Sequence, residues 1–351
     1  MALTQVQSGI LADSTQTYGM KNRIINGAMV IDQRNAGASV TITAVTSQFS
    51  VDRWNLVSLA ASKFSVQQNA AAVTPPAGFK NYVGITSLSA YAVAATDVFA
   101  IRQSIEGYNI ADLGWGAAGA QTVTLSFWVR SSLTGTFGGN LQNSAQTQSY
   151  PFSYTISTAN TWEQKSITIA GSTTATWEAT NGMGMQVAFS VGSGTSYSGT
   201  SGAWVASNIW SVTGATSVVG TNGATFYITG VQLEKGSTAT SFDFRDIGRE
   251  FILCQRYYQS LTCANYAGFH YSTSGYTGIF LPVCMRVTPT VLTTSSTTWY
   301  EASVPYTWTA TNIVGQSPQS ISLQGTISGG GGGTNGFAGT LQPTFTVSAE
   351  L

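Results

Sequence analysis

The run TVTLSFWVR (122–130) decides the fold class, because apolar and polar residues alternate along its whole length. Every second residue is a valine, leucine or phenylalanine, and the positions between them hold threonine, serine, Trp128 and Arg130. Successive side chains of an extended chain point to opposite faces, so one face of this run is apolar and the other is polar. The run therefore predicts an antiparallel strand with one face buried in a core.

Shorter runs repeat this alternation and end in clusters of glycine, serine, asparagine or threonine, which favour turns. They lie at 64–66, 167–169, 187–191 and 204–210. Many short strands joined by turns favour a β-sandwich or jelly roll over alternating strands and helices. We predict an all-β fold, with a jelly-roll domain at 21–245 and a smaller β-rich domain at 260–351.

One segment, DIGREFILCQRYYQ (246–259), has the pattern of a helix. Asp246 is a suitable N-cap, and Ile247, Phe251 and Cys254 recur at the spacing of one helix face. The segment also concentrates charged residues in a chain that otherwise avoids them. We predict a short helix at 246–259 that connects the two domains. The first 20 residues are polar and lack a core pattern.

Composition and charge narrow the function. In the 351 residues, 14 Lys and Arg offset 14 Asp and Glu, and charged residues make up 8%, against about 25% in typical soluble domains. Binding nucleic acid through its phosphates requires a clustered basic face, so we expect no nucleic-acid partner. At 43% hydrophobic and 11% aromatic residues, the chain is too apolar to be disordered. A surface with few charges and no net charge favours an oligomer.

The ends and the apolar runs of the sequence carry two further expectations. The first residues lack the basic and apolar regions of a secretory signal, so we expect none. No run of apolar residues approaches the length that a membrane span needs, so we expect no membrane insertion.

Metal and cofactor sites are not indicated. Cys254, Cys263 and Cys284 form an odd set without a CxxC spacing, and His270 is the one histidine. We expect free thiols and no cofactor. Asp32, Asp52, Glu163 and Glu234 are weak candidates for a calcium site, of the kind that sandwich modules often contain. The alternative for these carboxylates is ion pairing with Arg34, Arg53, Lys165 or Arg245.

Catalysis would require a specific pair of groups. Glycoside hydrolysis uses two carboxyl groups roughly 5–10 Å apart, and Glu163 with Glu178, beside Trp162 and Trp177, is the one pair that we place on neighbouring strands. The sequence contains no GxSxG motif of a serine hydrolase. We therefore expect binding and assign no catalytic residue.

Glycan binding is the function that the aromatic residues favour. Sugars present apolar C–H faces that stack on aromatic rings, and hydroxyl groups that pair with amides and carboxylates. Aromatic residues on the polar face of a strand or in loops are therefore the candidates, and Arg130 joins them because it shares a face with Trp128. The candidates are Trp115, Trp128, Arg130, Trp162, Trp177, Trp204, Tyr271, Tyr276 and Trp299. The alternative is that these rings pack in a core or against a neighbouring subunit.

Several blocks of the sequence resemble a known group of proteins. They are NRIINGAMVIDQRN (22–35), VDRW (51–54), QSIEGYNIADLGWG (103–116), AQTVTLSFWVRSS (120–132), ITGVQLEKGSTATSFDFR (228–245), CQRYYQ (254–259) and FLPVCMRVTPT (280–290). Together they resemble bacteriophage and prophage virion proteins of the tail-fibre or head-appendage type, which have a jelly-roll domain similar to carbohydrate-binding modules. The resemblance covers about residues 20–290.

This resemblance implies a location and partners. It implies a homotrimeric β-rich protein of the virion that residues 1–20 attach to capsid, tail or adaptor proteins, and that binds host-surface glycans. Two alternatives remain open, namely a capsid decoration or head-fibre protein with a purely structural role, and a glycan depolymerase that acts through Glu163 and Glu178.

Overall fold

The computed structural model describes residues 20–43, 48–262, 266–295, 298–301, 304–328, 338–341 and 344–351. The attachment segment predicted at 1–20 lies outside these residues apart from Met20, as does Cys263. The chain divides into two compact units, Met1–Asp246 with Leu351, and Ile247–Glu350. The predicted fold class, all-β with a jelly-roll sandwich, a smaller β-rich part and a short connecting helix, is confirmed.

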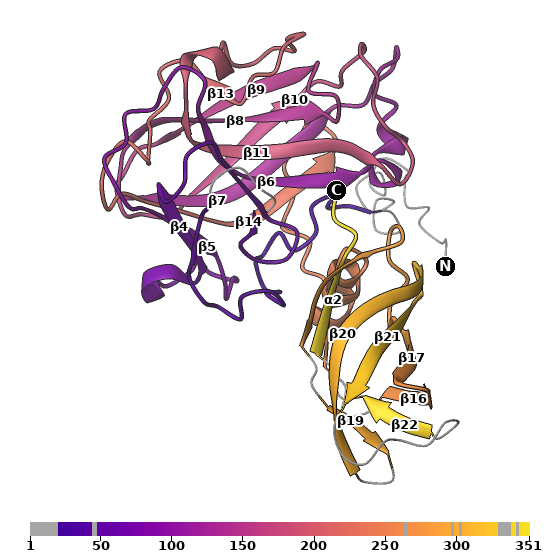
Figure 1. Cartoon of the computed structure of the whole chain (residues 1–351). Helices are drawn as coiled ribbons and strands as arrows, with labels where there is room; N and C mark the ends of the chain where they lie inside the picture. The colour runs from indigo at the N-terminus through magenta and orange to yellow at the C-terminus, as the bar shows by residue number, and fades with distance from the viewer. Residues whose placement is uncertain are drawn as a thin grey trace, which may run out of the picture. The chain divides into compact units, whose positions relative to one another are not determined.

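The first unit is a sandwich of two antiparallel six-stranded sheets (Figure 1). In spatial order, the first sheet contains β1 (Val40–Thr41), β4 (Phe64–Gln68), β5 (Val83–Ser87), β14 (Thr225–Lys235), β7 (Val123–Ser131) and β10 (Glu163–Ile169). The second contains β2 (Gln48–Phe49), β3 (Asn55–Ser58), β6 (Val98–Glu106), β11 (Met183–Ser193), β8 (Gly135–Asn143) and β9 (Ser149–Ile156). Two short parallel strands, β12 (Ser198–Gly199) and β13 (Ser211–Val212), lie in the connection from β11 to β14.

The alternation of apolar and polar residues in 122–130 shows which face of β7 packs in the core of the sandwich. The apolar residues of β7 are fully buried between the sheets, whereas Trp128 and Arg130 are half-buried on the opposite face. Rings from the second sheet meet β7 across the core, since Phe127 lies 4.8 Å from Phe189 of β11, measured between ring centroids. One prediction was wrong, because 204–210 is not a strand and Trp204 and Trp210 belong to different clusters.

Short helical segments punctuate the strands. Within the described residues the α-helix is α2 (Ile247–Gln255), and 3-10 turns lie at Ala70–Ala72, Gly107–Asn109, Ala111–Leu113 and Thr195–Tyr197. The predicted helix therefore ends earlier than residue 259, because Tyr258 already begins a strand. No helix in the described part of the chain combines the length and apolar character that crossing a membrane requires.

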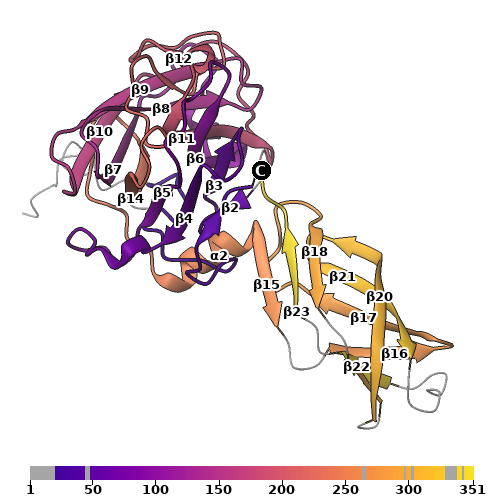
Figure 2. The same cartoon turned by 60° about the vertical axis from the view of Figure 1, so that its left-hand side comes forward.

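The second unit contains a closed six-stranded barrel and a three-stranded sheet (Figure 2). Around the barrel lie β16 (Tyr266–Tyr271), β17 (Ser274–Phe280), β21 (Ser320–Ser328), β20 (Val304–Ser317), β19 (Thr298–Glu301) and β22 (Ala338–Leu341). The sheet contains β15 (Tyr258–Thr262), β23 (Thr344–Ser348) and β18 (Thr290–Ser295).

Two tryptophans fill the barrel. The rings of Trp299 and Trp308 stack at 5.5 Å between centroids and 23° between planes, and both side chains are buried. Strand glycines make the space for them, since a Cβ on Gly325 would lie 2.1 Å from Trp308 and one on Gly339 would lie 2.3 Å from Trp299. The small barrel thus depends on large rings facing residues that have no side chain.

Candidate functional site

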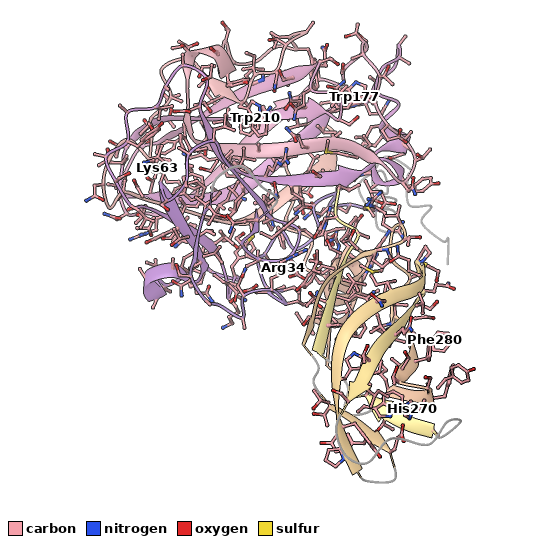
Figure 3. The ribbon with its side chains drawn as sticks, in the orientation of Figure 1. Arg34, Lys63, Trp177, Trp210, His270 and Phe280 are labelled. Carbon is pink, nitrogen blue, oxygen red and sulfur yellow. The ribbon has the colours of Figure 1, made fainter. Side chains whose placement is uncertain are left out.

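An aromatic row runs across the outer surface of the barrel. The strand register aligns Phe269 of β16, Tyr276 of β17, Gln324 of β21 and Asn312 of β20, so their side chains share one face. Phe269 and Asn312 are exposed, whereas Tyr276 and Gln324 are half-buried. The neighbouring residue His270 is buried on the opposite face (Figure 3). The alternation of these strands therefore places the row in solvent.

Contacts within the row hold the rings in place. Phe269 and Tyr276 stack with centroids 5.0 Å apart and planes at 12°. Gln324 Nε2 donates to the hydroxyl of Tyr276 at 3.0 Å and to Ser274 Oγ at 3.3 Å. Tyr271, which pairs with Ser274, is 64% exposed. We call Phe269, Tyr271, Ser274, Tyr276 and Gln324 the barrel surface.

The barrel surface combines two kinds of group that a sugar recognises. Its rings provide an apolar face that is already ordered, and Gln324 and Ser274 provide amide and hydroxyl groups at the edge of that face. None of these five residues is charged, so the surface can contact neutral polyols by stacking and hydrogen bonding. Tyr271 and Tyr276 are among the residues that the sequence indicated.

Trp299, a third candidate of this unit, is not on the barrel surface. None of its side chain is exposed, its Nε1 donates to Glu301 Oε1 at 2.8 Å, and its ring stacks on Trp308. His270 Nδ1 lies 2.8 Å from the same Glu301 oxygen. Trp299 is therefore a core residue that a ligand cannot reach in this structure.

Three other candidates lie on the outer face of the first sheet, and two of them, Arg130 and Trp162, already have protein partners. Arg130 donates to the Asn160 carbonyl at 2.9 Å and lies 5.3 Å from the Tyr227 ring centroid. Trp162 donates to the Thr74 carbonyl at 2.9 Å and packs against Tyr82. Trp128 lies in register with Gln164 and Thr229 and is half-buried. The fold brings the three onto one face of the sheet, where protein partners hold Arg130 and Trp162.

Trp115, Trp177 and Trp204 form one cluster, with ring centroids 4.8 to 5.4 Å apart. Each indole N–H donates to a backbone carbonyl, those of Gln121, Thr174 and Ala170 respectively. Trp115 and Trp177 are buried, and Trp204 is half-buried. The cluster thus presents little open ring face and mainly holds the loops around 115, 177 and 204 together.

The weak calcium candidates accept hydrogen bonds from the protein. Asp32 accepts from the backbone N–H groups of Asn35 and Gly37, and Glu234 accepts from Thr240 and Gln232. Asp52 accepts from the backbone and side-chain N–H groups of Gln33, and burial raises its pKa to about 6. Within the described ranges, no three His, Cys, Asp or Glu side chains lie together as a metal would need.

Contrary to the prediction, Glu163 and Glu178 do not lie on neighbouring strands. Glu163 begins β10, whereas Glu178 lies in the loop between β10 and β11, where its carboxylate accepts from Thr180.

The pKa values of Glu163 and Glu178 also argue against a general-acid role for either residue. Burial raises the pKa of Glu163, but hydrogen bonds from Lys165, Thr158 and Ser157 outweigh it and lower the pKa overall. The hydroxyl and N–H of Thr180 lower the pKa of Glu178. Lys165 also forms the expected ion pair with Glu163, at 2.6 Å.

Sequence reasoning missed the polar partners in both units. Gln324 sits in the alternating run SISLQGTIS, where its outward position was readable, but nothing in the sequence pairs it with Tyr276. On the outer face of the second sheet, Arg102 donates to Asn55 and Gln186, and Gln186 donates to Gln142. Burial lowers the pKa of Arg102. These residues come from four strands that are far apart in the chain.

Comparison with known proteins gives structural neighbours and no family. No protein-family model matches the sequence, and no curated protein matches it. Among solved structures, the chain is similar to a putative sugar binding protein from Bacteroides thetaiotaomicron, with a TM-score of 0.36, 12% identity, and coverage of 62% of this chain and 100% of that one. A family 11 carbohydrate-binding module from Clostridium thermocellum, in complex with a mixed-linked tetrasaccharide, gives a TM-score of 0.28 at 10% identity, over 56% of this chain and 96% of that one.

A third neighbour is the enzymatically active domain of tailspike protein 4 from bacteriophage CBA120. Its TM-score is 0.33 at 12% identity, and the match covers 61% of this chain but only 21% of that one. The structural neighbours are thus carbohydrate-binding modules and a phage tailspike domain. At these TM-scores and identities, they assign no ligand, partner or family to the chain.

Proposed function

We propose that this chain is a non-catalytic glycan-binding protein and that the barrel surface is its contact with the sugar. The observation that carries the proposal is the stacked pair of Phe269 and Tyr276, with Gln324 bonded to the Tyr276 hydroxyl. Rings that already stack lose little side-chain entropy when a ligand binds to them. The barrel surface therefore offers a preformed face for a pyranose ring.

The absence of charge on the barrel surface defines the class of glycan. A neutral aromatic face with an amide and a hydroxyl at its edge favours neutral sugar residues over charged ones, because no ion pair is offered. The row is four strands wide and continues past Tyr276 and Gln324 to the exposed Asn312. Neighbouring strands lie about 4.8 Å apart, so the row has the length of two or three sugar residues and favours an oligosaccharide.

The acidic residues support binding in place of catalysis. Glu163 and Glu178 do not lie on neighbouring strands, and hydrogen bonds lower both pKa values. A general acid needs a raised pKa. We therefore propose that glycans are bound and released unchanged.

The site of action that we propose is a phage particle, with the chain as a homotrimeric tail-fibre or appendage component. The sequence blocks quoted above, from NRIINGAMVIDQRN to FLPVCMRVTPT, support this proposal, as does the low content of charged residues. Light scattering of the purified chain measures the trimer, and attachment to virions that lack the chain measures the location. A monomer, or a trimer that ignores such virions, would refute it.

The binding proposal is tested with Tyr276→Ala and Tyr271→Ala, screened on arrays of neutral oligosaccharides and on intact host cells. The loss of one stacked ring is expected to weaken binding about 10-fold. Tyr108→Ala is the matched control, because Tyr108 is 61% exposed and lies in the other unit. Wild-type protein that binds no glycan, or Tyr276→Ala that binds as well as wild type, would refute the proposal.

A purely structural role is the second candidate, and the exposed apolar residues of the barrel favour it. Phe280 is 85% exposed, and Ile313 and Val314 of β20 are also exposed. Figure 3 labels Phe280 on the second unit. Such residues suit a contact between subunits. If Phe280→Ala converts the oligomer to monomer and glycan screens are blank, this second candidate replaces the first.

A further inference from the structure

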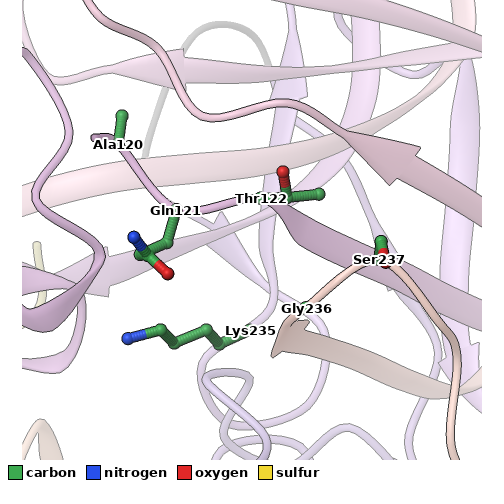
Figure 4. Close-up of a pocket in the computed structure, with 6 residues that line it drawn as sticks. All are labelled: Ala120, Gln121, Thr122, Lys235, Gly236 and Ser237. Carbon is green, nitrogen blue, oxygen red and sulfur yellow. The ribbon is translucent and has the colours of Figure 1, made fainter. Parts of the chain in front are cut away.

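A polar pocket lies at the end of the β7 and β14 pair in the sandwich (Figure 4). Its volume is about 420 Å³, and it is lined by Ala120, Gln121, Thr122, Lys235, Gly236 and Ser237. This volume falls within the range of small-molecule sites, roughly 300–1,000 Å³, and it accommodates one sugar ring. The pocket belongs to the first unit, and the barrel surface to the second.

Backbone and hydroxyl contacts fix the floor of this pocket. The N–H of Gly236 donates to the Thr122 carbonyl at 2.8 Å, which ties the start of β7 to the end of β14. The hydroxyls of Thr124 and Thr168 donate to the carbonyls of Gly236 and Ser237 at 2.8 and 3.1 Å. The backbone of Thr122, Gly236 and Ser237 is therefore already positioned before a ligand arrives.

The lining groups retain unused hydrogen-bonding capacity. Gln121 donates to the Gly119 carbonyl, but among the described residues no donor reaches its amide oxygen. Within the residues that the structure describes, neither the hydroxyl of Thr122 nor that of Ser237 has a hydrogen-bond partner. Figure 4 shows the side chains of Gln121 and Lys235 extending to the same side of the pocket. The lining residues thus carry an amide oxygen, two hydroxyls and an ammonium group.

Lys235 gives the pocket a positive charge. Its Nζ donates to the Asp112 carbonyl at 3.3 Å and lies 3.7 Å from the Asp112 carboxylate. That carboxylate already accepts two hydrogen bonds from Arg23, at 2.6 and 2.8 Å. Two cations therefore share one anion, and an ammonium group has three N–H donors, of which Lys235 uses one within the described residues.

We propose that this pocket binds a carboxylated sugar residue, such as a uronic acid, with Lys235 holding the carboxylate and Gln121, Thr122 and Ser237 holding ring hydroxyls. None of the lining residues is aromatic, so stacking cannot hold a neutral sugar here, and the ammonium group must supply the main attraction. The pocket and the barrel surface have no residue in common, so this proposal stands whether or not the barrel surface binds neutral glycans.

The test is an NMR titration of the full-length ¹⁵N-labelled chain with sodium D-glucuronate. D-glucose has the same ring without the carboxylate, and acetate has the carboxylate without the ring. Glucuronate is expected to shift the amide signals of Gln121, Thr122 and Ser237. Glucose and acetate are expected to bind there at least 10-fold more weakly, because each lacks half of the contacts.

Two substitutions of Lys235 distinguish the contribution of its positive charge to binding from that of its size and shape. Lys235→Gln is expected to weaken glucuronate binding about 10-fold, and Lys235→Arg should retain most of it because the charge remains. Lys80→Gln, which removes an exposed lysine elsewhere in the same unit, is the control. The dispersion of each variant's spectrum reports whether it is folded.

Three results would overturn the proposal. They are glucuronate shifts that avoid the pocket, Lys235→Gln that binds as tightly as wild type, and acetate or glucose that matches glucuronate there, which would mean an adventitious anion only or a site for any sugar. Signals around Tyr276 in the same spectra report on the barrel surface, so failure of one proposal is distinguishable from failure of the other.

Discussion

The packing of the barrel makes a specific prediction about Gly325. A methyl group built on Gly325 would lie 2.1, 2.3 and 2.5 Å from three atoms of the Trp308 indole. Non-bonded carbon atoms prefer roughly 3.5–4.0 Å, so Gly325→Ala forces the indole to move. Trp308 cannot move easily because it stacks on Trp299, which in turn fits against Gly339.

The size of the expected loss of stability follows from this lack of space around Trp308. Overpacking a core with one methyl group costs about 1–3 kcal/mol, and we expect the upper end because both indoles are confined. For a unit of about 100 residues, a loss of about 3 kcal/mol lowers Tm by more than 10 °C. Gly325→Ala should therefore reduce the stability of the barrel while the sandwich remains folded.

Gly278→Ala is the matched control on the neighbouring strand. Gly278 is exposed on β17, and a methyl group there would meet no heavy atom within 4 Å. This variant has the same gain in backbone rigidity as Gly325→Ala, about 0.5–1 kcal/mol, but lacks the clash. The difference between the two variants therefore isolates the steric term.

Two measurements check the prediction. Scanning calorimetry of both variants gives the Tm of the barrel transition, and hydrogen exchange read by mass spectrometry gives the protection of peptides from β20 and β21. In Gly325→Ala, the Tm of the barrel transition and the protection of these peptides should both fall. In Gly278→Ala, both should stay at the wild-type level. If Gly325→Ala unfolds at the wild-type temperature with wild-type protection, the stacked indoles do not fill the barrel as described.

Two further predictions concern the sandwich. Because the pKa of Asp52 is about 6 in the folded chain and 3.8 ordinarily, the folded state binds the proton more tightly, and the free energy of unfolding should fall as pH rises from about 4 to 6. This fall in the free energy of unfolding amounts to roughly 3 kcal/mol, and Asp52→Asn should abolish it. Urea unfolding at pH 4 and pH 7 measures this, and an equal change with pH in wild type and variant would contradict it. Trp204→Ala should cost about 3 kcal/mol, since Trp204 packs on Trp115, Trp177 and Tyr150, while Trp204→Phe keeps part of that packing and should cost less. Urea unfolding measures the loss of stability in each variant. Glycan binding at the barrel surface should be unchanged in Trp204→Ala and in Trp204→Phe.

Local patterns predicted the elements of this protein well. The alternation at 122–130 gave a strand with the correct buried face, and the segment at 246–259 gave a helix, seen at 247–255. The run at 204–210 failed because its tryptophans are held by contacts outside the run. The Trp204 indole donates to Ala170, and the Trp210 ring packs over Arg102.

The candidate site was predicted in part. Exposed aromatic residues in the last third of the chain were visible in the sequence, but Tyr276 and Trp299 looked alike there. The barrel separates them, since Tyr276 faces solvent beside Gln324 and Trp299 faces the glycines. Alternation within a strand gives two faces and does not say which face points inward once a barrel closes.

The sequence by itself determined the all-β class, the buried and outward faces of the strand at 122–130, the helix and the lack of charge, because each of these depends on composition or on residues close together in the chain. The tertiary structure decided which strands pair and therefore which side chains meet. Phe269 and Gln324 are 55 positions apart in the chain, yet they flank Tyr276 in one row. Lys235 and Gln121 reach the same pocket only because β14 lies beside β7. Such juxtapositions depend on long-range pairing and packing, which no local pattern of residues specifies.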